Sequence, residues 1–261
     1  STSIGRPPVT SLIPNTNVND DNQTVSAANT GLKPQFSDNF DFNLEYYFQS
    51  IGFVSVSAFQ KDVTGFIYSS NSTYIGSGPD NGFEGLYEGY RLTTSFNGGK
   101  ARYRGVEFSY SHQFTFLPGF WRGFGVNVNV TRLETRGDYG GTVATTQVPG
   151  FRPKSANAVL NYQQGRYRAS LQANWVGNFL LTTSTNAALL VYEAARTSMN
   201  FKFTFDLTRR TSLYFNADNL LRTPINSRYY AYEDRIGFTR LPFRSVRSEE
   251  HTSELQSLTN L

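Results

Sequence analysis

The sequence predicts an all-β chain, an antiparallel meander of about eight to nine long strands that forms an incomplete segment of a transmembrane β-barrel. Three observations predict this fold class. Apolar and polar residues alternate over long segments, short and long connections follow one another in turn, and 15% of the residues are aromatic although the mean hydropathy is −0.42. A barrel wall accounts for all three, because its strands face lipid on one side and water on the other.

The alternation is clearest in the first strand, where Phe40, Phe42 and Leu44 are separated by Asp41 and Asn43. A strand tilted across the hydrocarbon core needs about 9–11 residues. The alternative is a soluble β domain, whose strands usually have about 5–6 residues. The segments here are long, and we predict strands at 38–48, 53–63, 102–116, 124–134, 154–162, 167–177, 195–206 and 211–221.

The connections between these strands alternate strictly in length. Short connections are predicted at 49–52, 117–123, 163–166 and 207–210, and long ones at 64–101, 135–153 and 178–194. Outer-membrane barrels have tight periplasmic turns and long extracellular loops, so the pattern orients the chain. Residues 1–37, rich in Asn, Thr, Ser and Pro, are interpreted as the tail of one extracellular loop, with disorder as an alternative.

The two faces of the wall can be assigned from the same alternation. One face of the strand at 124–134 is assigned to lipid: Phe124, Val126, Val128 and Val130. Arg168 and Lys202 fall on the lumenal face, as expected, because a Lys or Arg facing lipid near the bilayer centre costs about 2–4 kcal/mol. The segment 53–63 is the least regular, because Phe53 and Phe59 lie on the face opposite its apolar residues.

Residues that could carry catalysis are few. The chain has no cysteine and two histidines, which largely excludes the usual nucleophile–base and metal-ligand combinations, so we expect no enzyme and no cofactor. An outer-membrane lipase or protease is the enzymatic alternative, but His112 is expected to be an interfacial side chain near the periplasmic side. Lys and Arg are scattered, so the pI of about 9.2 does not indicate nucleic-acid binding.

Aromatic and charged residues gather in the longest loop: Phe83, Glu84, Tyr87, Glu88, Tyr90 and Arg91. They could form part of a vestibule that captures a ligand, since loops often carry function. The interpretation that we favour is a solvated loop that packs on itself. The ligand-binding residues are therefore unknown at this point.

Four segments, in order, resemble the C-terminal part of the β-barrel of TonB-dependent outer-membrane receptors. They are LKPQFSDNFDFNLEYYF at 32–48, SVSAFQKDVTGFI at 55–67, RYRGVEFSY at 102–110 and NADNLLRTP at 216–224. The resemblance implies a barrel of about 22 strands with a plugged lumen. It also implies a place in the outer membrane of a Gram-negative bacterium, in contact with lipid.

The function that this resemblance implies is active uptake of a scarce nutrient, such as a metal chelate, a corrinoid or a saccharide. The small-molecule ligand would bind at the extracellular loops. Energy would come from the TonB complex through a plug region that this chain lacks. The alternative is a passive outer-membrane porin or an adhesion barrel.

The pattern changes at Arg247, where alternation and aromatic residues stop. RSEEHTSELQS, at 247–257, resembles the translation of a common short-read sequencing adapter. We therefore expect a partial barrel domain at 1–246 and an artefactual or disordered tail at 247–261. The absence of a signal peptide at Ser1 suggests a chain that begins within its gene product. An open sheet of this kind is expected to aggregate or to fail to insert, because lipid cannot satisfy its edges.

Overall fold

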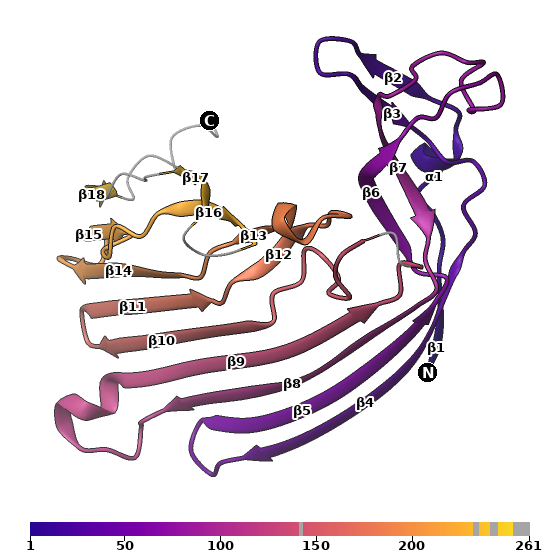
Figure 1. The fold of residues 1–261 in the computed structure, drawn as a ribbon. Coiled ribbons are helices and arrows are strands. Elements are labelled where there is room, and N and C mark those ends of the chain that lie inside the picture. Colours follow the sequence, from indigo (N-terminus) through magenta and orange to yellow (C-terminus); the bar gives the residue numbers. More distant parts are fainter. Residues whose placement is uncertain (141–142, 232–234, 241–244, 253–261) are drawn as a thin grey trace, which may run out of the picture.

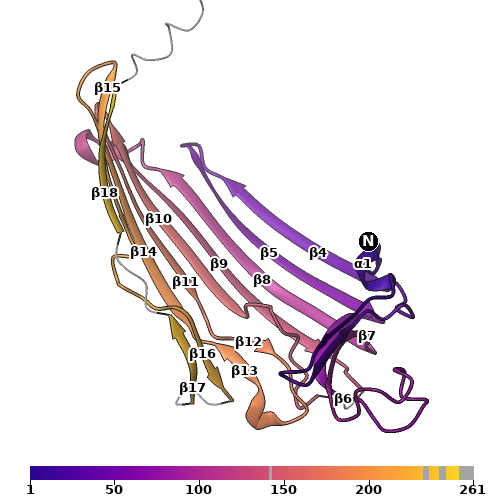
Figure 2. The same ribbon diagram turned by 90° about the horizontal axis from the view of Figure 1, so that it is seen from above.

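A ten-stranded antiparallel sheet forms the main body of the computed structural model, which describes residues 1–140, 143–231, 235–240 and 245–252. The sheet curves into an open wall (Figures 1 and 2). The strands, in spatial order, are β1 (Thr2–Gly5), β4 (Gln35–Tyr47), β5 (Gly52–Thr64), β8 (Lys100–Gln113), β9 (Phe124–Gly137), β10 (Lys154–Gln164), β11 (Tyr167–Val176), β14 (Arg196–Asp206), β15 (Thr211–Asp218) and β18 (Ser245–Thr252). The predicted all-β, antiparallel and unclosed wall is confirmed.

All eight predicted strands are present, as β4, β5, β8, β9, β10, β11, β14 and β15. Two of them end about three residues earlier than expected. β8 stops at Gln113 because the chain turns there toward the short helix η1 (Gly119–Gly123), with the Leu117 amide donating to the Phe114 carbonyl. β15 stops because Asn219 takes a left-handed backbone conformation, with φ of 50°, and its side chain exchanges hydrogen bonds with the Thr223 backbone.

The first 37 residues are partly built into sheets, so the alternative of disorder is wrong for this segment. β1 pairs with the beginning of β4, from Thr2 opposite Asp38 to Gly5 opposite Gln35. A short helix, α1 (Val9–Leu12), and two further strands, β2 (Thr16–Asn19) and β3 (Thr24–Ala27), follow before β4. None of the helices in the described part of the chain is long and apolar enough to cross a bilayer.

Two small sheets lie at one end of the large sheet (Figure 1). In the first, the order is β2, β3, β7 (Arg91–Asn97) and β6 (Ile67–Tyr74), with β3 and β7 parallel. In the second, the order is β12 (Phe179–Thr182), β13 (Val191–Glu193), β16 (Ile225–Tyr230) and β17 (Ile236–Arg240), with the short helix η2 (Ala187–Leu189) between β12 and β13. These eight strands were not predicted.

The short turns lie at the opposite end of the large sheet, at 48–51, 114–123, 165–166 and 207–210 (Figure 1). The predicted sorting of connections by length is therefore confirmed. In the predicted orientation, the two small sheets are extracellular and the short turns are periplasmic.

A buried cluster joins the first loop region to the large sheet. Val63 of β5, Ala101 of β8, Phe66 and Tyr139 form it, and Tyr68, Tyr103 and Val143 pack against it. The Phe66 and Tyr139 rings meet edge to face, with centroids 5.3 Å apart. Burial raises the pKa of the Tyr139 hydroxyl well above its usual range. The core thus lies at the extracellular end of the wall and fixes the loops to it.

β18 includes the first residues of the segment at 247–261, and residues 253–261 lie outside the described part of the chain. The register pairs Ser248 with Phe215 and Glu250 with Leu213. Both partners in β15 belong to an apolar row, where a membrane strand is expected to carry apolar residues. The resemblance of this segment to a translated adapter stays a prediction.

Candidate functional site at the extracellular end of the wall

The strand register establishes which residues share the membrane face. Phe108 of β8 pairs with Val56 of β5 and Val130 of β9, so three apolar residues lie side by side. β10 continues the row, since Ala156 pairs with Val130. The residues of this row on β4 are largely exposed to solvent in this wall. The exposed fractions are 66% for Phe40, 64% for Phe42 and 63% for Leu44. An exposed apolar band of this extent fits a face that contacts lipid.

The opposite, lumenal face carries hydrogen-bonded polar residues. Ser109 donates to Asn129 at 2.8 Å and Ser111 donates to Asn127 at 2.7 Å, both across β8 and β9. Arg168 of β11 pairs with Asp206 of β14 at 2.7 Å. Lys202 lies on the same face, because it pairs in register with Ser170. The predicted lumenal positions of Arg168 and Lys202 are confirmed.

The irregular strand β5 places its two phenylalanines toward the lumen. The ring of Phe53 lies 6.0 Å from that of Tyr47 on β4. Phe59 covers Gly105, its register partner on β8, and a Cβ atom added there would lie 2.7 Å from the ring. The lumenal phenylalanines of β5 therefore fill space against neighbouring strands.

His112 lies in an aromatic cluster at the periplasmic end of β8. Its ring stacks on Phe48 at 4.7 Å, and its two nitrogens contact hydroxyl groups, Nε2 that of Ser50 at 2.6 Å and Nδ1 that of Tyr110 at 3.0 Å. A hydrolytic triad places an acidic group on Nδ1, whereas here the partner is a phenol. His112 thus lies among aromatic rings at the strand end, and its assignment as an interfacial side chain stays a prediction.

The extracellular loop at 75–90 is organised by Asn81. Its side-chain amide donates to the carbonyls of Gly76 and Leu86, and its oxygen accepts from the backbone amides of Phe83 and Gly85. These four bonds close the loop on itself. Sequence analysis missed Asn81, because it is neither charged nor aromatic.

The structure brings together the aromatic members of the predicted loop cluster and leaves its acidic members apart. Tyr87 lies 6.0 Å from Phe83 and 5.6 Å from Tyr90, measured between ring centroids. Tyr90 donates to Asp20 at 3.1 Å, and this hydrogen bond raises the pKa of Tyr90. Glu84 and Glu88 are exposed and make no ion pair with any described residue. This packing supports the interpretation of a loop that packs on itself.

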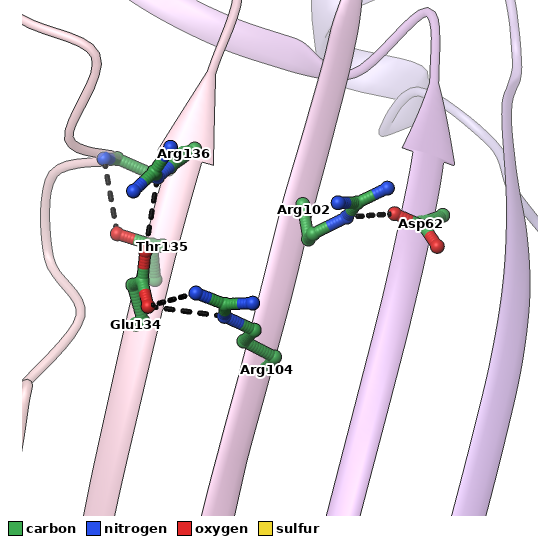
Figure 3. Close-up of polar contacts among 7 residues, drawn as sticks. Asp62, Arg102, Arg104, Glu134, Thr135 and Arg136 are labelled. Carbon is green, nitrogen blue, oxygen red and sulfur yellow. Dashed lines mark hydrogen bonds and ion pairs between the residues drawn. The ribbon is translucent and has the colours of Figure 1, made fainter.

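A second charged group lies on β5, β8 and β9 and was not predicted. Glu134 accepts from Nε and Nη2 of Arg104, at 3.0 and 2.7 Å, and from Nε of Arg136 at 2.9 Å. Arg102 donates to Asp62 at 2.6 Å. Figure 3 shows these side chains directed toward one another from neighbouring strands. We call Arg102, Arg104, Arg132 and Arg136 the outer arginine cluster.

A cavity of about 1130 Å³ lies at the extracellular ends of β5, β8 and β9. Charged residues and loop residues line it together, among them Asp62, Lys100, Asp138, Tyr139 and Thr145. No group of three metal-ligating side chains occurs among the residues that the structure describes. Asp38, Arg102 and Arg136 line it as well, so the cavity opens on the same face of the wall as the outer arginine cluster.

Comparison with known proteins gives one family match. The family described as TonB dependent receptor-like, beta-barrel, matches residues 1–220. No curated protein matches the chain.

Solved structures with the same fold are outer-membrane receptors and transporters. The ferric enterobactin receptor PfeA of Pseudomonas aeruginosa is 16% identical, with a TM-score of 0.60 over 88% of this chain and 32% of the receptor. The copper transporter OprC is 16% identical, with a TM-score of 0.62 over 96% of this chain and 35% of the transporter. The ferric-catecholate import receptor Fiu of E. coli K12 is 16% identical, with a TM-score of 0.58 over 86% of this chain and 28% of the receptor. The chain thus spans about a third of the length of these proteins.

Proposed function

Since this chain belongs to the TonB-dependent receptor-like β-barrel family, we propose that it is a wall segment of a receptor that imports a scarce metal chelate. Proteins of this family are transporters and receptors of the Gram-negative outer membrane and are not enzymes. PfeA, OprC and Fiu are receptors or transporters of iron complexes or copper, which supports a metal complex over a corrinoid or a saccharide.

The observation that carries this proposal is the family match over residues 1–220, together with the loops at the extracellular end of the wall. Two small sheets and a buried aromatic core hold these loops in place. A receptor needs an ordered outer surface to select its ligand, whereas a passive porin needs an open channel. We propose that uptake is driven through the TonB complex, and the family match favours this over a passive porin.

The test uses the intact receptor that contains this segment, in a strain from which its gene has been deleted. The strain is given a ferric catecholate, a copper chelate, cyanocobalamin or a maltodextrin as the limiting nutrient. We expect the receptor to restore growth on a metal chelate, and a protonophore to abolish uptake while binding persists. Uptake that continues after the proton gradient has collapsed would identify a passive porin.

A loop variant separates the two interpretations of the aromatic loop. If Tyr87 and Tyr90 contact the ligand, the double substitution Tyr87→Ala, Tyr90→Ala weakens chelate binding by about tenfold, since each aromatic contact contributes about 0.5–1.5 kcal/mol beyond area burial. Unchanged affinity would assign these tyrosines to loop packing alone. Leu207→Ala, in a periplasmic turn, is the control.

A further inference from the structure

The outer arginine cluster lies on the membrane face of the wall and not on the lumenal face. Phe108 and Val130 are register partners on the lipid-facing row. Two residues further along, Val106 pairs with Arg132, and two further still, Arg104 pairs with Glu134. Because strand side chains alternate with a period of two, all of these residues share one face.

The height of the cluster follows from strand geometry. Phe124 begins the apolar row of β9 at the periplasmic end, and Arg132 lies eight residues further along. At about 3.3 Å per residue and a tilt of about 40°, this distance corresponds to about 20 Å of membrane depth. The apolar band of such barrels is about 25 Å tall. Arg132 therefore lies about 5 Å below the outer boundary of the band, and Arg104, which is level with Glu134, lies about at that boundary. Arg136 lies in the layer of lipid headgroups above it.

The cluster carries positive charge that its neighbours do not neutralise. Its four arginines share this face with three carboxylates: Asp62 and Glu134, which bind them, and Asp38, the register partner of Asp62. Arg132 is exposed and makes no ion pair with any residue in the described ranges, and its register partner on β10 is Lys154. Glu134 binds Arg104 and Arg136 together, so their remaining guanidinium N–H groups are available side by side. Paired guanidinium groups suit the geometry of a phosphate.

An apolar groove begins directly below these arginines. Its volume is about 640 Å³, and Phe40, Phe42, Ala58 and Val106 line it. Arg104, Arg132, Gln60 and the carboxylate of Glu134 lie at its polar end. The small side chain of Ala58 leaves space between the larger residues. Charge and apolar surface are therefore arranged as in a phosphorylated lipid, with the headgroup outside and the acyl chain toward the bilayer centre.

We propose that the outer arginine cluster and this groove bind a phosphorylated lipid of the outer leaflet. The phosphate accepts hydrogen bonds from Arg104, Arg132 and Arg136, and one acyl chain lies in the groove beside Val106. This site is on the outside of the barrel. The proposal is independent of the nutrient that the receptor carries through its lumen, and it can fail or hold separately from the proposed transport function.

The test measures lipid binding to the intact receptor in detergent micelles, by native mass spectrometry. The probes are bisphosphorylated lipid A, the same lipid with both phosphates removed, and inorganic phosphate. We expect removal of the phosphates to weaken binding by at least about tenfold, because charge-assisted hydrogen bonds are among the strongest in proteins. Inorganic phosphate is expected not to displace the lipid, because it lacks the acyl chain.

Variants locate the site. The double variant Arg104→Gln, Arg132→Gln should weaken binding of bisphosphorylated lipid A by at least about tenfold, because both substitutions remove a charged donor to the phosphate. Val106→Trp should weaken binding of both lipids by filling the groove. Arg168→Gln, on the lumenal face, is the matched control and should bind like the unmodified receptor.

Three results would overturn the proposal: equal binding of the phosphorylated and dephosphorylated lipids, unchanged binding by the double arginine variant, or displacement of the lipid by inorganic phosphate. Unchanged binding by Val106→Trp would overturn the acyl-chain position. If the double variant does not assemble into a heat-modifiable barrel, the comparison of the two lipids on the unmodified receptor decides the question.

Discussion

Gly105 shows how a single residue sets the packing between three strands. It lies in β8, and a Cβ atom at this position would approach the Phe59 ring of β5 and the Arg132 carbonyl of β9 to 2.7 Å each. Real Cβ atoms essentially never approach so closely. The glycine therefore allows the Phe59 ring of β5 to lie over the backbone of β8. Packing of an aromatic ring over a glycine on the next strand helps to fix strand register in β-sheets.

At this scale we predict that Gly105→Ala destabilises the intact receptor by about 1–3 kcal/mol, because the added methyl group overpacks the site. The midpoint of urea unfolding in lipid vesicles measures the effect. Adding Phe59→Ala to Gly105→Ala should restore only part of the lost unfolding free energy, since the Arg132 carbonyl still obstructs the methyl group. Full recovery in the double variant would show that the ring alone sets the limit.

Residue-scale contacts between strands were the hardest to predict. Asp62 and Arg102 lie on neighbouring strands, as do Arg104 and Glu134, and each pair meets only after register is fixed. Alternation assigns a face within one strand but does not specify which residue on the next strand lies opposite. The outer arginine cluster was missed for this reason. Asn81 was missed because its role depends on four backbone partners and not on its chemical type.

At the scale of the element, β9 separates its two environments residue by residue. Val128 lies on the lipid-facing row, and Asn127, its neighbour, accepts a lumenal hydrogen bond from Ser111. The two positions lie at nearly the same depth. They therefore form a matched pair for testing the face assignment.

We predict that Val128→Arg destabilises the intact receptor by about 2–4 kcal/mol, the cost of a lipid-facing arginine near the bilayer midplane. Asn127→Arg should cost about 1 kcal/mol, corresponding to the lost hydrogen bond, because its guanidinium remains in water. Equilibrium unfolding in vesicles gives both values. Equal losses for the two variants would show that the faces have been assigned incorrectly.

Elements that span the membrane were predictable from sequence, and the small sheets were not. The eight long strands carry alternation over enough residues to be recognised. β12 and β13 have four and three residues, and β13 pairs with β16, which lies more than 30 positions further along the chain. Such strands have no lipid-facing row, so the period-two pattern that predicts the wall is absent from them.

At the scale of the whole molecule, the wall is open along β4. β1 covers Gln35–Asp38, and Ser1 exchanges hydrogen bonds with the backbone of Asn39. In the described part of the chain, β4 pairs with β5 alone from Phe40 onward. Unpaired backbone amides and carbonyls cost several kcal/mol each in lipid, which is why membrane sheets close into barrels. The wall therefore requires further strands before it is stable in a bilayer.

We predict that residues 1–246, expressed alone with an export signal, aggregate in the periplasm and do not accumulate in the outer membrane. Heat-modifiable migration on gels and resistance to protease measure barrel formation. The intact receptor, expressed from the same promoter, is the control and should show both properties. A protease-resistant barrel formed by residues 1–246 would contradict this prediction.

The parallel pairing of β3 with β7 has a consequence for motion. Thr24, Val25 and Ser26 pair with Arg91, Leu92 and Thr93, so the segment before β4 is hydrogen-bonded to the connection between β5 and β8. Two loops that are distant in sequence form one mechanical unit. A ligand that displaced one of them would carry the other along, and the hinge for such a movement would lie where the chain enters β4 and leaves β5.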